Sequence, residues 1–179
     1  MPTSLCQLAA WYGLDRTPLR GHDYTPTYYE LFDTRQRMLV RKVMEIGIAH
    51  GWGLLLWREW FPNAEIYGID ANHEFMKNME RIRSYVANQG SEGDMRNAAA
   101  WAGDGFDLIM DDASHEPAHQ ISSAHIMFPL LRPGGWYVIE DVINADAVAP
   151  HLPAPCEIRT LNIARDPWDR LLIMRKEGG

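Results

Sequence analysis

Short apolar runs alternate with stretches of helical spacing through the middle of the chain. The runs are rich in aliphatic and β-branched residues, which indicates strands, and the stretches between them are long enough for helices. The predicted strands are residues 41–48, 64–71, 84–90, 106–113 and 135–142, and the predicted helices are residues 53–61, 73–83, 95–102 and 116–128. Strands that alternate with helices predict a parallel sheet with helices on both faces.

The C-terminal end departs from that alternation. Residues 156–164 and 169–176 predict two further strands, and only residues 165–168 join them. So short a link allows an antiparallel hairpin but no crossover helix. We therefore expect an α/β fold with a Rossmann-like, doubly wound, seven-stranded sheet, mostly parallel and ending in a C-terminal antiparallel hairpin.

An N-terminal segment precedes the first predicted strand. Residues 4–13 and 25–39 predict two helices, with a polar loop between them. Ser4 and Thr25 are the expected N-caps, and Pro26 is expected at the first position of the second helix.

Composition and length limit the possible partners. A chain of 179 residues suits one domain, here an N-terminal helical segment (1–40) and a cofactor-binding core (41–179). A net charge of −7 without a Lys/Arg cluster argues against a nucleic acid or an anionic membrane as partner. We expect no signal peptide and no transmembrane helix. The widely separated Cys6 and Cys156 make the reducing cytoplasm the simplest location.

The stretch "SHEPAH" (114–119) contains H-E-x-x-H, the zinc pattern of many metalloproteases. That pattern needs both histidines inside one helix. Pro117 lies between them, and proline is disfavoured inside a helix but suits its first turn. The stretch therefore predicts a junction between the fourth strand and its helix, with Ser114 or His115 near the cap. We interpret His119 as an ordinary helix residue and set a zinc hydrolase aside.

A glycine-rich loop follows the first predicted strand in "EIGIAHGWG" (45–53). Its spacing differs from the G-x-G-x-x-G of dinucleotide sites, and Glu45 would repel a pyrophosphate. A carboxylate here suits a ligand that carries an amine and a sulfonium, and Gly47 lets such a ligand approach the backbone. A tight strand-to-helix turn would explain the glycines equally well.

Two further acids follow the next strands. Asp70 ends the second strand, where an acid typically binds a ribose diol. Asp94 follows the third strand and could accept from an adenine amino group, with Met95 packing on the ring. Each acid alone could be a cap or a turn residue, but ligands bind at this edge of open α/β sheets.

Six stretches carry a family resemblance. The stretches are LAAWYGLDR, HDYTPTYYELF, MEIGIAHGWG, WREWFPNAEIYGID, FDLIMDDASHEPAHQ and FPLLRPGGWYVIED. Through them the chain resembles class I S-adenosylmethionine-dependent methyltransferases and, more narrowly, the metal-dependent sugar O-methyltransferases of macrolide biosynthesis, of the macrocin and mycinamicin type. The resemblance implies that Glu45, Gly47, Asp70 and Asp94 contact the methyl donor, S-adenosylmethionine. We predict the same role for Gly51, Met95 and Asp111.

The chain departs from this family at named positions. The family tends to have two adjacent glycines and a serine where this chain has Gly51, Trp52 and Gly53, and usually glycine in place of Ala113. Trp52 could cover the methionine end of the donor or pack the loop. The tyrosines at 24, 28 and 29 could line an acceptor cleft or pin the N-terminal helices.

Three carboxylates are expected at one corner of the sheet. Asp112 ends the fourth strand, and Glu140 and Asp141 end the fifth. If those strands are neighbours, they lie about 4.8 Å apart. Three negative charges so close together repel one another, and a bound divalent cation relieves this repulsion. Ligands that are all oxygen favour Mg²⁺ over Zn²⁺. The resemblance implies the same role for the three acids, whereas the alternative is that Asp112 caps a helix and the other two begin a loop.

The resemblance also implies that His115 is the general base. A histidine with a pKa near ~6.5 can take the proton of an acceptor hydroxyl. We therefore predict an S-adenosylmethionine- and Mg²⁺-dependent O-methyltransferase of antibiotic or other natural product biosynthesis, which methylates a sugar or another small hydroxylated acceptor. A phenol or catechol acceptor, or an inactive S-adenosylmethionine-binding partner protein, are the alternatives. A homo-oligomer is expected.

Overall fold

The computed structural model describes residues 4–161 and 169–178, and its strands form one seven-stranded sheet. The strand order is β3-β2-β1-β4-β5-β7-β6. The strands are β1 (Lys42–Ile46), β2 (Glu65–Asp70), β3 (Ile82–Val86), β4 (Phe106–Asp111), β5 (Leu131–Ile139), β6 (Cys156–Thr160) and β7 (Arg170–Arg175). This order confirms the predicted Rossmann-like α/β sheet.

The pairing of the strands follows the prediction. Strands β1 to β5 pair in parallel, and β7 runs antiparallel to both β5 and β6. The predicted link at 165–168 lies outside the described residues. Because β4 and β5 are neighbours, the residues that follow them meet at the same edge of the sheet.

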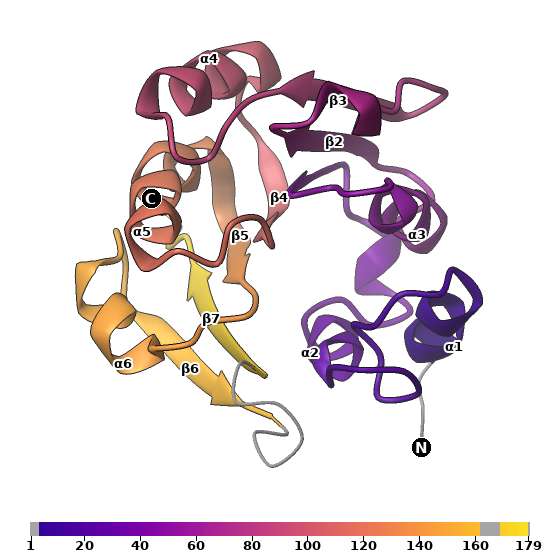
Figure 1. Cartoon of the computed structure of the whole chain (residues 1–179). Coiled ribbons are helices and arrows are strands. Elements are labelled where there is room, and N and C mark those ends of the chain that lie inside the picture. Colours follow the sequence, from indigo (N-terminus) through magenta and orange to yellow (C-terminus); the bar gives the residue numbers. More distant parts are fainter. Residues whose placement is uncertain (1–3, 162–168, 179) are drawn as a thin grey trace.

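Helices cover both faces of the sheet (Figure 1). On one face lie α1 (Ser4–Trp11), α2 (Tyr24–Leu31) and α3 (Trp52–Trp60), and on the other lie α4 (Glu92–Ala102), α5 (Pro117–Met127) and the short α6 (Ala145–Val148). Short 3-10 turns are η1 (Gln36–Met38), η2 (His73–Phe75), η3 (Phe128–Leu130) and η4 (Ala149–His151). The N-terminal helices therefore belong to the same core as β1 and α3.

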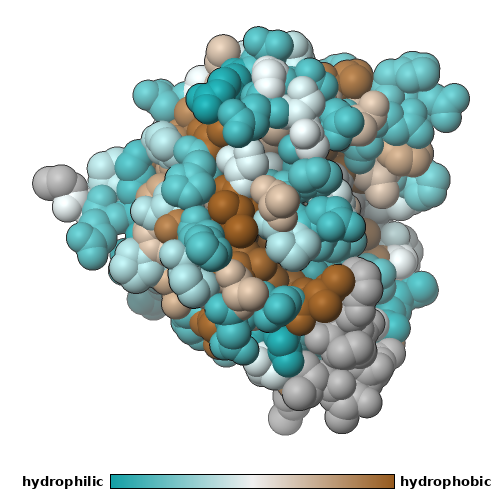
Figure 2. Space-filling view, turned by 60° about the vertical axis from the view of Figure 1, so that its left-hand side comes forward, coloured by the Kyte–Doolittle hydropathy of each residue, from teal (hydrophilic) through white to brown (hydrophobic). Residues whose placement is uncertain are grey.

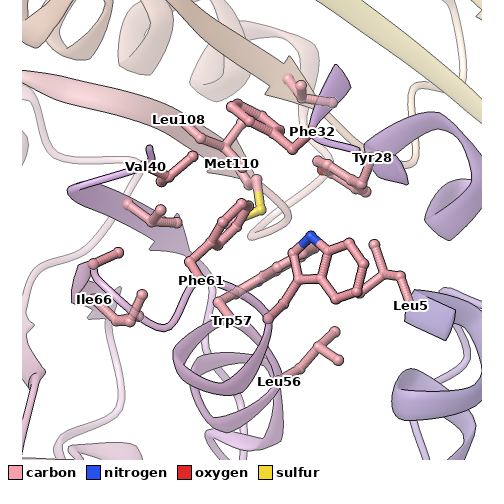
Figure 3. Close-up of a cluster of buried hydrophobic side chains, with 14 of the residues drawn as sticks. Leu5, Tyr28, Phe32, Val40, Leu56, Trp57, Phe61, Ile66, Leu108 and Met110 are labelled. Atoms are coloured by element: carbon pink, nitrogen blue, oxygen red, sulfur yellow. The ribbon is translucent and has the colours of Figure 1, made fainter. Parts of the chain in front are cut away.

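Trp57 of α3 lies in the core that the N-terminal segment shares with the sheet (Figure 3). Its ring packs edge-on against Tyr28, with centroids 5.0 Å apart, and stacks on Phe61 at 5.9 Å. Trp57 and Trp60, three positions apart on α3, are both buried. Aromatic burial of this kind holds α2 against α3 and so brings the N-terminal helices to the sheet edge.

One predicted helix is wrong. Residues 73–83 form a single 3-10 turn and then a tight turn into β3, which begins at Ile82. Side chains take the backbone donors that a helix would have used: Lys77 N donates to Ser84 Oγ at 2.8 Å, and Ser84 N donates to Asn78 Oδ1 at 3.0 Å. Arg81 has φ +62°, which ends any helical path. Local polar side chains outcompeted the helical spacing.

Several boundaries also differ from the prediction. Asp23, not Thr25, stands at the N-cap of α2, which ends at Leu31, and Pro26 is its third residue and not its first. Helix α4 begins at Glu92, three residues earlier than predicted, because Ser91 caps it; Asp94 therefore lies in its first turn. Strand β5 already begins at Leu131, which pairs with Phe106, and the register then shifts. The glycines that follow Pro133 thus form a bulge within the strand.

The surface is mixed in character. Figure 2 shows a band of hydrophobic residues across one face, flanked by hydrophilic ones. Part of the hydrophobic surface belongs to a groove between α4 and α5, lined by Ala118, Ile121 and Ile126. None of the helices in the described ranges has the length and apolar character needed to cross a membrane.

The cap of α4 gives a first testable expectation. Ser91 Oγ accepts from the N–H of Asp94 at 3.3 Å. We expect Ser91→Ala to lower the free energy of unfolding by about 1 kcal/mol, because a backbone N–H in the first turn of α4 loses its hydrogen-bond acceptor. Urea denaturation measures the change. Ser122→Ala, inside α5 where no cap is needed, is the matched control, and an equal loss in both variants would contradict the cap.

Candidate functional site

Four acids gather where β1, β4 and β5 end. Glu45 lies on β1, Asp112 directly follows β4, and Glu140 and Asp141 directly follow β5. Glu45 and Glu140 are buried, whereas Asp112 and Asp141 are partly exposed. The parallel order of these strands brings side chains that are nearly 100 residues apart in sequence to one corner, as the sequence predicted.

Two cavities adjoin at this corner. The first, of about 310 Å³, runs past the ends of β1 and β2 and is lined by Asp70, Asn88 and Gln89 among others. The second, of about 420 Å³, contains the four acids and the loop between α1 and α2. Both are lined by Gly47, Ala49, Asp112 and Ala113. They therefore adjoin at the carboxyl ends of β1 and β4, and we refer to the two cavities together as the cleft.

Arg16 is the cation of the acidic corner. Its Nη1 donates to Glu45, its Nη2 donates to Asp112, and its Nε lies 2.8 Å from Glu140 Oε2. Burial opposes the charge of Arg16, but the three carboxylates outweigh it and raise its pKa well above the usual value. For the acids, burial raises the pKa of Glu45 and of Glu140, and the positive charge of Arg16 opposes that rise. One guanidinium thus joins three strands through their acids.

Two tyrosines of α2 reach the same acids. Tyr28 donates its hydroxyl to Glu140 Oε1, and Tyr24 donates to Asp141 Oδ1. His22 stacks on Tyr24 with centroids 4.9 Å apart, and its Nδ1 lies 3.8 Å from Asp141 Oδ1. The tyrosines therefore hold α2 against the acids of the site, and Tyr24 also lines the second cavity.

Asp112, His115 and Asp141 form a possible cation site. Each offers one ligand atom, and these atoms lie within 4.8 Å of one another. His115 and Asp141 both have positive φ, +56° and +52°, which is uncommon for residues with side chains. Two carboxylates and an imidazole at this spacing fit a divalent cation. The predicted third ligand, Glu140, is adjacent, but its two oxygens face Tyr28 and Arg16.

The glycine loop is shaped by close backbone contacts. Gly47 has φ +88°, and a Cβ there would lie 2.2 Å from the carbonyl oxygen of Asp112. Gly51 has φ +78° and precedes α3, and a Cβ there would meet the Lys77 side chain at 2.7 Å. Of the two glycines, Gly47 lines the cleft and Gly51 does not. Trp52 is half exposed and lines the second cavity.

Asp70 and Asp94 differ in their position relative to the cleft. Asp70 lines the first cavity, and its Oδ2 accepts from the N–H groups of Ile48 and Ala49 at 3.0 and 3.1 Å. It therefore also fixes the glycine loop. Asp94 Oδ2 accepts from Asn88 N at 3.1 Å, so that it supports a residue of the cavity wall from behind.

Asp111 and Met95 lie behind the wall of the first cavity. Asp111 is buried and accepts from Gln89 Nε2 at 2.6 and 2.8 Å. Burial raises its pKa to about 7. Met95 packs in the core on the α4 side of the sheet. Gln89 itself lines the cavity, so Asp111 orients a residue that faces the cleft.

Sequence reasoning missed Arg16, His22, Asn88 and Gln89. The last two follow β3, whose boundary was predicted two residues too late. Arg16 and His22 lie in a polar loop with no pattern of their own. The one available signal was indirect, since several acids expected in a buried corner require a counter-charge.

A seven-stranded sheet in this order, with its C-terminal antiparallel pair and a cleft at the carboxyl ends of the strands, defines the methyltransferase type of Rossmann-like fold. Residues 44–142 match the family described as a methyltransferase domain. The chain belongs to this methyltransferase family.

Named relatives modify sugars of natural products. The chain is 38% identical over 138 residues to demethylmacrocin O-methyltransferase of Streptomyces fradiae, covering 72% of this chain and 34% of that protein. It is 35% identical over 151 residues to 8-demethyl-8-(2-methoxy-alpha-L-rhamnosyl)-tetracenomycin-C 3'-O-methyltransferase of Streptomyces olivaceus, covering 80% and 38%. The chain thus spans little more than a third of the length of these relatives.

A solved structure shares the fold over almost the whole chain. It is the MycE methyltransferase of the mycinamycin biosynthetic pathway in complex with Mg, SAH and mycinamycin VI, with a TM-score of 0.73 and 25% identity. The match covers 98% of this chain and 54% of that one.

Proposed function

We propose that the chain is an S-adenosylmethionine- and Mg²⁺-dependent O-methyltransferase that acts on a hydroxyl of a sugar or another small natural product. The observation that carries the proposal is the junction of the two cavities at Gly47 and Asp112. One ligand can extend from the first cavity to the acids of the second. The names of the relatives support the acceptor class and a role in antibiotic biosynthesis.

The donor fits the cleft from end to end. The first cavity, with Asp70 at the end of β2, suits the nucleoside, because an acid at that position can accept from a ribose diol. Glu45 in the second cavity suits the ammonium of the amino-acid end. Asp94, Met95, Asp111 and Gly51 stay predictions as direct contacts. Their present positions support the cavity walls, and Asp111 does so through Gln89.

The acidic corner suits the acceptor. Asp112, Glu140 and Asp141 are the proposed ligands of Mg²⁺, and Glu140 would turn one oxygen away from Tyr28 or Arg16 to reach it. When bound, the cation would supply charge stabilisation to the oxygen of an acceptor hydroxyl. His115 lines the same cavity and takes the proton of that hydroxyl on a ring nitrogen. The residues of the cleft hold the oxygen in line with the methyl group, and positioning supplies much of the rate.

A second function is favoured by one observation. Arg16 makes ion pairs with Glu45, Asp112 and Glu140 and so supplies part of the positive charge that this corner needs. A protein that binds S-adenosylmethionine and acts as a partner subunit could use the corner in this form. A phenol or catechol acceptor is the remaining alternative for the enzyme.

One assay separates these functions. The full chain is incubated with S-adenosylmethionine, Mg²⁺ and a panel of glycosides, sugars and catechols, and release of S-adenosylhomocysteine is measured with and without a chelator. We expect chelator-sensitive turnover with a glycoside or sugar. Turnover with catechols alone would shift the acceptor class. Donor binding without turnover would favour the partner protein, and no donor binding would refute the proposal.

Two expectations are not tested by the structure or the relatives. The homo-oligomeric state and the cytoplasmic location stay predictions. Sedimentation of the purified chain with and without donor measures the first.

A further inference from the structure

Arg16 has a place in the cleft that its structural ion pairs do not explain. It lines the second cavity together with Glu45, although its side chain is 95% buried. Within the described chain, the lining of both cavities contains no other arginine or lysine. A permanently charged guanidinium therefore faces the space next to the acid that we assign to the donor ammonium.

The guanidinium has donors to spare. Arginine carries five N–H groups in one plane. The hydrogen bonds to Glu45 and Asp112 use one N–H each on Nη1 and Nη2, and Nε lies within ion-pair distance of Glu140. One N–H therefore remains on each terminal nitrogen to donate to a further oxygen.

An α-amino acid carries an ammonium and a carboxylate on the same carbon. Glu45 and Arg16 offer a negative and a positive group in direct contact with each other, one for each of these charges. Without a cation, the donor carboxylate would enter a corner that already contains the carboxylates of Glu45, Asp112 and Glu140, at a high cost in repulsion.

We propose that Arg16 binds the α-carboxylate of the methyl donor while Glu45 binds its ammonium. The loop between α1 and α2 thereby contributes to the donor site and selects donors with an intact amino-acid end. The inference rests on the proposed function, since it assumes that the cleft takes S-adenosylmethionine.

Lys77 is the alternative cation. It contacts the glycine loop near Gly51 and lines a small cavity with His50 and Trp52, two residues that also line the second cavity. It has no contact with Glu45 among those described, so the structure favours Arg16. Lys77→Met is therefore the matched control for charge removal beside the loop.

The test compares two ligands by isothermal titration calorimetry of the full chain. One is S-adenosylhomocysteine, and the other is its decarboxylated analogue, which keeps the amine and the adenosine. We expect the unaltered chain to prefer S-adenosylhomocysteine on the order of 10- to 100-fold, the range of charge-assisted hydrogen bonds. Arg16→Met should reduce this preference to about 2-fold and leave binding of the analogue within about 3-fold. Lys77→Met should keep the full preference.

Arg16→Lys keeps the experiment decisive if Arg16→Met does not fold. It retains one charge but lacks the planar pair of N–H groups, so we expect a preference of about 3- to 5-fold. Equal weakening of both ligands in Arg16→Lys would mean a merely structural role and would overturn the inference. So would an unaltered chain without preference, or loss of preference in Lys77→Met.

The two proposals fail in different ways. If the unaltered chain binds both ligands equally, the assignment of Arg16 is wrong while the donor site stands. If it binds neither ligand, the proposed function falls and the assignment falls with it.

Discussion

Asp112→Asn is expected to reduce turnover by at least about 10³-fold, because the cation that stabilises the acceptor oxygen loses an anionic ligand. Asp112 is the acid that lines both cavities and lies within 4.8 Å of the ligand atoms of His115 and Asp141. Asparagine has nearly the same shape, so the effect reports the charge. Steady-state kinetics at saturating Mg²⁺ with an acceptor found in the assay above measures it.

The same substitution should leave the donor bound. We expect the dissociation constant of S-adenosylhomocysteine to change by no more than about 3-fold, because the carboxylates proposed to bind the donor are Asp70 and Glu45 and not Asp112. Asp104→Asn, an exposed acid after α4, is the control. Wild-type turnover in Asp112→Asn, or turnover that a chelator does not affect, would remove the metal from the mechanism.

Gly47→Ala should be the most disruptive change in the glycine loop. An alanine at φ +88° is strained, and its Cβ would lie 2.2 Å from the Asp112 carbonyl oxygen, which is backbone and cannot move aside easily. We expect a loss of about 3 kcal/mol in the free energy of unfolding, from strain and overpacking together. Donor binding should weaken by about 100-fold, because both cavities narrow at their junction.

Gly105→Ala separates the cost of backbone strain from the cost of the close contact with the Asp112 carbonyl oxygen. Gly105 has φ +85°, but a Cβ there would meet nothing within 4 Å. We expect it to cost about 1 kcal/mol from backbone strain alone and to leave donor binding unchanged. Urea denaturation and calorimetry of both variants provide the measurement. Equal costs for the two alanines would show that the contact between Gly47 and Asp112 is unimportant.

The sheet was predictable because its signal is repeated. Each parallel strand is an apolar run followed by a turn, and the short link before the last strand allowed only a hairpin. The same regularity located the acids, since the ends of the predicted strands that precede Asp112, Glu140 and Asp141 lie within about three residues of the observed strand ends. Asp112, Glu140 and Asp141 do lie together at that edge.

What the sequence could not show depends on contacts without a local pattern. Arg16 lies in a loop, and its role follows only from three acids on three different strands. The failed helix at 73–83 had the right spacing, but Ser84 and Asn78 supplied competing acceptors. The orientation of Glu140 toward Tyr28 likewise depends on how α2 docks, which no periodicity encodes.

The contacts between the N-terminal segment and the acids also have a temporal consequence. Arg16 and Asp112 are separated by 96 residues in the chain, Tyr28 and Glu140 by 112, and Tyr24 and Asp141 by 117. Contacts of such high sequence separation close late, because the entropy of a long loop must be overcome first. Both ends of this span must therefore have left the ribosome before the acidic corner can form.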